Sequence, residues 1–155
     1  MFRHVAILAV CCAFAASSSV AQTANATLTV NGMVISLQVA PLKQTYNSFW
    51  EFNGSQMGLR SEGNARSFYY TQPRDTLTEL GVSSGQLQFD GQRMGSRYVG
   101  TSRVFTQNCG SFNYAVTGVV APDDRSVTLV GWAPVLDAAC AVVGKQELVN
   151  VYNLQ

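Results

Sequence analysis

Residues 109–140 read CGSFNYAVTGVVAPDDRSVTLVGWAPVLDAAC, and this stretch decides the fold. The turn-forming sequence PDDR at 122–125 separates two segments rich in β-branched residues, which predicts a β-hairpin. We expect a register that places Val120 opposite Leu129, Gly118 opposite Gly131 and Val116 opposite Ala133. Cys109 and Cys140 fall in the same register, so a disulfide is predicted at the open end of the hairpin.

The two faces of the second strand of this hairpin differ in the sequence. Val127, Leu129, Gly131 and Ala133 share one apolar face, which leaves Trp132 on the other face. Glycine inside a strand often marks a bend or a close approach by another group. The expected pair of glycines would leave a gap, which we expect a bulky side chain such as Tyr114 or Phe89 to cover, with a bound ligand as the alternative.

Residues 1–21 have the pattern of a signal peptide. Arg3 precedes an apolar run at residues 5–16, and the small residues Ser19 and Ala21 place the cleavage after Ala21. The run is shorter than the roughly 20 residues that span a bilayer, so no integral membrane anchor is expected. The sequence therefore predicts an exported protein, periplasmic or secreted, with a single domain over residues 22–155.

Composition narrows the partners of this domain. The chain has 10 Lys and Arg against 9 Asp and Glu, so loss of Arg3 leaves a mature chain without formal net charge. Its arginines are scattered along the sequence, whereas nucleic-acid binders carry a basic patch. We therefore expect no nucleic-acid partner. Cys109 and Cys140 are the two cysteines left in the mature chain, and their spacing differs from the CxxC of redox-active pairs.

The rest of the chain is a series of short strands. Asn31-Gly32 between the alternating segments 26–30 and 33–39 is a strong hairpin signal, because a type I′ turn needs positive φ at both central residues. Further strands are expected at 45–52, 65–71, 86–90, 97–106 and 146–152, with a weaker segment at 58–63 and a loop at 91–96. A single helical turn is predicted at 75–81, with Asp75 as its N-cap.

About eight or nine short strands predict an all-β fold. An antiparallel up-and-down barrel of about eight strands, similar in size to a lipocalin, is favoured because closure removes exposed sheet edges. A β-sandwich is the alternative, since one sequence does not reveal strand order. The segments 100–105 (GTSRVF), 108–110 (NCG) and 131–134 (GWAP) resemble those of small exported bacterial β-proteins without an assigned function, so the resemblance implies no site residues.

Several chemistries are excluded by the absence of histidine from the mature chain, since His4 belongs to the signal peptide. Ser-His-Asp and Cys-His catalysis and histidine metal sites are ruled out, and we expect neither a metal nor a cofactor. A glycoside hydrolase that uses two carboxylates stays open as the weakest alternative. The leading hypothesis is a non-enzymatic exported protein that binds a small apolar ligand or a partner in the cell envelope.

Aromatic residues are the best candidates for such a site. The residues that could line a pocket or platform are Trp50, Phe52, Tyr98, Tyr114 and Trp132. Their other interpretation is a role in the core, which the sequence favours for all of them except Trp132. A further hypothesis is a protein inhibitor of a secreted hydrolase, in which Asp137 on the loop before Cys140 would be the exposed acidic contact.

Overall fold

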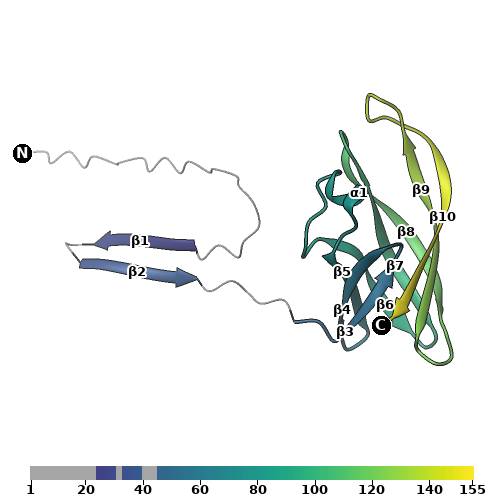
Figure 1. Cartoon of the computed structure of the whole chain (residues 1–155), viewed down its shortest axis with the longest axis horizontal. Helices are drawn as coiled ribbons and strands as arrows, with labels where there is room; N and C mark the ends of the chain where they lie inside the picture. The colour runs from purple at the N-terminus through teal and green to yellow at the C-terminus, as the bar shows by residue number, and fades with distance from the viewer. Residues whose placement is uncertain (1–23, 31–32, 40–44) are drawn as a thin grey trace, which may run out of the picture. The chain divides into compact units, whose positions relative to one another are not determined.

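The structure is a computed structural model that describes residues 24–30, 33–39 and 45–155. It contains two compact units, divided between residues 43 and 44. In the first, β1 (Ala24–Val30) and β2 (Met33–Val39) form a two-stranded antiparallel sheet with Val30 opposite Met33, which confirms the predicted hairpin (Figure 1). The predicted signal peptide lies outside the described residues.

The second unit is a closed antiparallel barrel of eight strands, in which each strand pairs with the next and the last returns to the first (Figure 1). The strands are β3 (Ser48–Phe52), β4 (Ser55–Glu62), β5 (Ala65–Gln72), β6 (Leu87–Met94), β7 (Arg97–Thr106), β8 (Gly110–Val120), β9 (Ser126–Leu136) and β10 (Val142–Leu154). This confirms the predicted barrel over the sandwich. The first barrel strand begins at Ser48, well after the predicted domain boundary at residue 22.

Tight turns connect the early strands. Asn53 and Gly54 join β3 to β4 with φ angles of 49° and 80°, which is why Asn and Gly occupy these two positions. The loop predicted at 91–96 is wrong, because β6 continues through Gly91 to Met94. Gly91 lies opposite Gly100 of β7, and a Cβ on either residue would overlap the backbone of the facing strand. The two glycines permit a close approach of β6 and β7, so Gly91 serves strand packing and not the predicted loop.

The predicted helical turn forms as α1 (Asp75–Thr78) in the segment between β5 and β6. The prediction that Asp75 is the N-cap is wrong. Asp75 is the first residue of the helix, and Arg74 before it is the N-cap, in an extended conformation. Gly81 ends the segment with a φ of 84°, a conformation that favours glycine. No helix in the described part of the chain is long and apolar enough to cross a membrane.

The predicted register of the β8–β9 hairpin is wrong by two residues. Gly118 lies opposite Leu129, and Gly131 lies opposite Val116. The loop at 122–125 is closed by a hydrogen bond from the Ala121 N–H to the Ser126 carbonyl, 2.9 Å, so the ladder is symmetric about the loop itself. The two inward faces keep their identity, because a shift of two residues returns each side chain to the same side. The expected glycine gap is absent, although the Tyr114 ring does lie against Gly131.

The Cys109–Cys140 disulfide is present, with 5.5 Å between the two Cα atoms, which confirms that prediction. It lies outside the β8–β9 ladder, which spans Val116 to Val120 on β8 and Val127 to Gly131 on β9. Beyond this ladder β8 stays with β7 and β9 stays with β10, and the disulfide joins the turn after β7 to the loop after β9. The cysteines thus link two hairpins that have separated.

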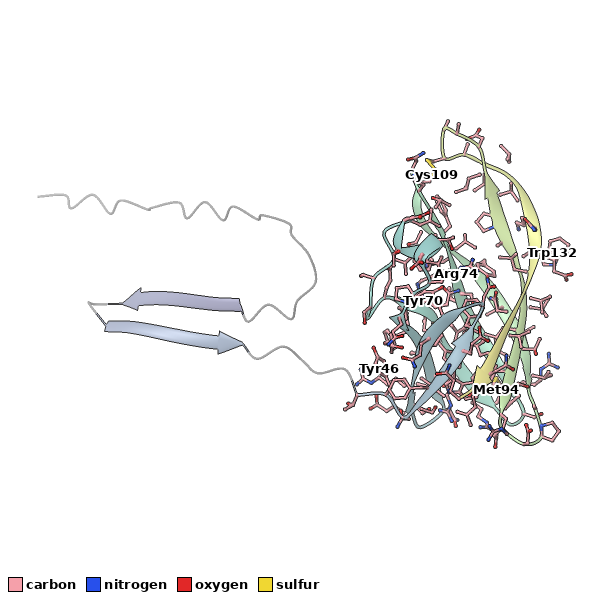
Figure 2. All side chains as sticks on the ribbon, viewed as in Figure 1. Tyr46, Tyr70, Arg74, Met94, Cys109 and Trp132 are labelled. Carbon is pink, nitrogen blue, oxygen red and sulfur yellow. A yellow bond between two sulfur atoms is a disulfide. The ribbon has the colours of Figure 1, made fainter. Side chains whose placement is uncertain are left out.

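Aromatic side chains fill the end of the barrel opposite the disulfide. The Phe68 ring stacks on Tyr152 at 4.2 Å between centroids, and Trp50 meets it edge-on at 5.6 Å. Phe89 and Tyr98 stack beside them at 6.1 Å. All five side chains are buried. Figure 2 shows Met94 and Cys109 at opposite ends of the barrel, and the packed core lies toward the Met94 end.

Candidate functional site

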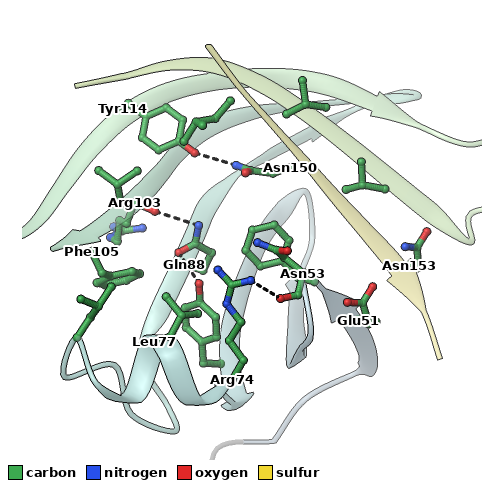
Figure 3. Close-up of a pocket in the computed structure, with 17 residues that line it drawn as sticks. Glu51, Asn53, Arg74, Leu77, Gln88, Arg103, Phe105, Tyr114, Asn150 and Asn153 are labelled. Atoms are coloured by element: carbon green, nitrogen blue, oxygen red, sulfur yellow. Dashed lines mark hydrogen bonds between the residues drawn. The ribbon is translucent and has the colours of Figure 1, made fainter. Parts of the chain in front are cut away.

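A cavity of about 590 Å³, called the mouth cavity here, lies where β10 leaves β3 (Figure 3). Within residues 45–155, these two strands pair only at Asn153 with Glu51 and at Leu154 with Trp50. The rest of β10 diverges from β3, and α1 lies on the other side of the opening. The cavity therefore enters the barrel through a break in its wall near the disulfide end.

An apolar belt surrounds the entrance to the mouth cavity. It consists of Phe52, Leu77, Leu80, Val104, Phe105 and Leu148. The two leucines come from the α1 segment, so this short helix serves as part of the wall. Phe52 is held by its ring, which stacks on Tyr152 at 4.6 Å between centroids. The belt offers a surface on which an apolar molecule can lose contact with water.

A polar floor lies beneath the apolar belt. Its members are Tyr70, Gln88, Ser102, Tyr114, Asn150 and Tyr152, of which the two tyrosines at 70 and 114 and the two amides line the cavity directly. The Tyr70 hydroxyl donates to Gln88 Oε1 at 3.2 Å, and Gln88 Nε2 donates to the Arg103 carbonyl at 3.0 Å. On the opposite side Asn150 Nδ2 donates to the Tyr114 hydroxyl at 2.8 Å (Figure 3).

A β-bulge explains how Gln88 reaches the floor. Phe89 faces Phe68 and Leu87 faces Tyr69, which leaves Gln88 as the extra residue of β6. Both Gln88 and Phe89 are consequently buried, although neighbours in a regular strand point to opposite faces. In a regular strand Phe89 alone of these two residues would point inward. The bulge turns the Gln88 amide inward as well.

The tyrosines of the polar floor are held in their protonated form. Burial raises the pKa of Tyr70, and it raises that of Tyr114 despite the hydrogen-bonding influence of Asn150 and Ser102. The pKa of Tyr152 is also raised well above 10, by burial first and by the neighbouring phenols second. All three hydroxyls therefore stay neutral donors at physiological pH, and the floor disfavours negative charge.

Charged groups stay at the rim of the mouth cavity. Arg74 donates to the Asn53 carbonyl at 3.1 Å, and Glu51 accepts from the Gly54 N–H at 2.6 Å. The Arg103 guanidinium pairs at 2.7 Å with the carboxylate of Asp90, a residue that does not line the cavity. The entrance is therefore charged, the belt apolar and the floor neutral but polar.

The structure separates the five aromatic candidates. Phe52 and Tyr114 line the mouth cavity, whereas Trp50 and Tyr98 are 4% and 2% exposed and belong to the core at the opposite end. Trp132 lies on the outer surface of β9 and is 59% exposed, on the face that the alternation predicted (Figure 2). Asp137 is exposed, but its Oδ1 accepts from the N–H groups of Ala139 and Ala141, both at 2.9 Å. That carboxylate therefore organises its own loop.

A second depression, called the side groove here, follows the line where β8 and β9 separate. Its volume is about 810 Å³, and it lies beside Trp132. Its apolar lining residues include Val99, Phe112, Val130, Trp132, Pro134 and Val142. Tyr114 borders both the side groove and the mouth cavity, so its side chain is part of the wall between them.

Sequence reasoning missed the polar floor. Asn150 lies at the same strand parity as Leu148 and Tyr152, so the alternation in 146–152 contained a signal for an inward amide. Gln88 gave no such signal, because the bulge that turns it inward is invisible in the alternation. The α1 leucines were likewise hidden, since a short turn carries no periodicity long enough to assign a face.

Acidic and metal-binding chemistry finds little support in these two cavities. Among the described residues, Glu51 is the single carboxylate that lines the mouth cavity, and none lines the side groove. Neither cavity therefore offers the carboxylate pair of a glycoside hydrolase. No group of three or more His, Cys, Asp or Glu side chains that could hold a metal ion occurs in the described residues.

The disulfide is consistent with an oxidising environment such as that of exported proteins. Comparison with known proteins adds nothing to the identification: no family model, no curated protein and no solved structure matches this chain significantly.

Proposed function

We propose that this protein is a non-enzymatic, exported binding protein that takes up a small, largely apolar ligand in its mouth cavity. The observation that carries the proposal is the uneven filling of the barrel. Aromatic rings occupy most of one end, where a depression of about 260 Å³ beside Trp50 and Tyr98 remains, whereas a larger cavity of about 590 Å³ with an apolar belt lies at the other. This volume lies within the range of roughly 300 to 1,000 Å³ that is typical of small-molecule sites.

The access route supports the same proposal. The mouth cavity opens to the surface through the break between β3 and β10, so a ligand needs no separation of paired strands to enter. Leu77 and Leu80 belong to a segment outside the ladder and can adjust to ligands of different shape. Export would place the protein in the compartment where its disulfide is stable.

Titration with N-phenylnaphthylamine, an uncharged fluorophore that brightens in apolar surroundings, tests this proposal. Saturable binding is expected. Leu77→Trp should reduce it strongly, because the larger side chain fills part of the mouth cavity. Val119→Trp is the matched control, since Val119 is 54% exposed on the outer surface of β8. Absence of saturable binding, or equal loss in both variants, would count against the mouth cavity as a ligand site.

A second candidate function is binding of an envelope protein at the side groove. The observation in its favour is Trp132, a large apolar side chain left exposed beside an apolar depression. Cross-linking in envelope extract should then capture one partner with the wild-type protein and lose it with Trp132→Ser. A capture that is unchanged by Trp132→Ser, or no capture at all, would remove this candidate. If the partner is a secreted hydrolase that the protein inhibits, Asp137→Ala should abolish its capture.

A further inference from the structure

The polar floor has hydrogen-bond donors to spare. Tyr114 accepts a hydrogen bond from Asn150 and retains its own hydroxyl hydrogen for donation. Ser102 Oγ and Tyr152 Oη are fully buried, and no hydrogen bond of good geometry joins them to another described residue, although Gln88 and Ser102 lie close to the Tyr152 hydroxyl. Ser102 does lie close enough to both tyrosines to favour their ionised forms, so the three hydroxyls form one group. Buried hydroxyls usually make well-formed hydrogen bonds, so this group keeps donor capacity that a further acceptor in the cavity would use.

The chemistry of that acceptor is limited by charge. The floor itself contains hydroxyls and amides and no ionised side chain, and the nearest charges are at the rim. Arg103 is already engaged by Asp90, and Arg74 stands at the entrance beside Asn53. A carboxylate pushed down to the floor would therefore lose its water without meeting a cation, which costs more than the hydroxyl donors return. An uncharged oxygen acceptor avoids this cost.

We infer that the ligand of the mouth cavity is an apolar molecule with an uncharged carbonyl oxygen at its inner end, such as a ketone or an ester, and that Tyr114 donates the hydrogen bond to it. This inference rests on the proposed function. The apolar body would lie against Phe52, Phe105 and Leu148. Tyr114 is the donor because, of the three hydroxyls with donor capacity left, it is the one whose side chain lines the cavity.

Two uncharged probes of similar ring size separate this inference from the proposed function. Prodan is a naphthyl ketone whose emission shifts to the red when its carbonyl accepts a hydrogen bond, and N-phenylnaphthylamine has no carbonyl. With the wild-type protein, prodan should bind with red-shifted emission. Tyr114→Phe should weaken prodan by about three- to tenfold and shift its emission to the blue, while N-phenylnaphthylamine binding changes little. Tyr98→Phe, which removes a tyrosine hydroxyl at the far end of the barrel, should change neither probe.

Retained N-phenylnaphthylamine binding shows that Tyr114→Phe is folded, and Tyr70→Phe provides a second floor variant if it is not. Tyr70→Phe should affect prodan less, because its hydroxyl already donates to Gln88. If neither probe binds, the proposed function fails. If N-phenylnaphthylamine binds but prodan responds equally in wild type and Tyr114→Phe, the inference is overturned and the proposed function stands. Tighter binding of the anionic anilinonaphthalene sulfonate than of prodan would also overturn the inference, because it would indicate an anion site at Arg74.

Discussion

Replacing both cysteines, Cys109→Ser with Cys140→Ser, should lower stability by an amount that the structure allows us to calculate. The two residues are 31 positions apart, and closing a loop of that length stabilises by about 3 to 4 kcal/mol through the entropy of the unfolded chain. The barrel unit has about 110 residues, so its unfolding entropy near 2.1 cal/mol/K per residue amounts to about 0.23 kcal/mol/K. The expected fall in Tm is therefore about 15 °C.

Circular dichroism melts of the oxidised wild type and the double variant measure this change, and wild type with a reductant is the control that should reproduce it. Hydrogen exchange adds a spatial test. The outer parts of β9 and β10 pair with one another but leave their other neighbours, so their amides should exchange faster without the disulfide. Those of β4 to β6 should change little at temperatures where the barrel is folded. A loss of Tm under about 5 °C together with unchanged exchange would refute the view that the disulfide holds the ends of β8 and β9 where their ladder has stopped.

The remaining predictions concern packing, protonation and one loop. Gly118→Ala should destabilise the barrel by about 2 kcal/mol or more in denaturant titrations, because a Cβ there would overlap the Thr128 carbonyl. Gly144→Ala should be nearly neutral, because a Cβ there would meet only the Val135 Cβ, at 4.0 Å. The tyrosines of the polar floor bind their protons more tightly in the folded state, so their contribution to stability should be constant below about pH 10 and fall as pH rises above it. Each such tyrosine contributes a slope of up to about 1.4 kcal/mol per pH unit. Tyrosinate absorbance that exceeds the contribution of the three tyrosines outside the floor and appears without unfolding would contradict this. Asp137→Ala should cost about 1 kcal/mol and speed exchange at Ala139 and Ala141, whose N–H groups it binds; an unchanged exchange rate would show that this carboxylate does not hold the loop.

Turn chemistry made individual hairpins predictable from the sequence. β1 and β2, which flank residues 31 and 32, pair as predicted, and Asn53-Gly54 joins β3 to β4 with positive φ at both residues. Local signals of this kind are strong because few residues tolerate that backbone conformation. The prediction of a loop at Gly91 is wrong because a glycine that allows two strands to approach closely cannot be distinguished in the sequence from a glycine in a turn.

The register error at β8–β9 has a different cause. The cysteines were taken to continue the ladder, but the strands have separated before the disulfide is reached. A disulfide fixes the distance between two Cα atoms and says nothing about the strand positions between them. The loop at 122–125, with Asp124 at a φ of 56°, would have set the register by itself. Local geometry was the better guide than a long-range covalent link.

The candidate site was harder to predict than the fold, because its members share no sequence pattern. Phe52 and Tyr114 were among the predicted residues, yet nothing in the sequence distinguished them from Trp50 and Tyr98, which the structure places in the core. Alternation identifies which side chains point inward but not how deep in the barrel they lie. Depth depends on the strand stagger around the closed barrel, a property of the whole fold.

The break at the mouth has its origin in strand length. β10 has 13 residues, whereas its neighbour β3 has 5, so β10 extends past the point where β3 ends. A hairpin without a lateral partner loses the ladder that would hold it, and the Cys109–Cys140 bond ties its tip back to the turn after β7. The cavity can then stay open beside β10 without leaving that hairpin free to move. On this reasoning the disulfide stabilises the shape of the mouth as well as the fold, because the β9–β10 hairpin that it holds contributes β10 to the site.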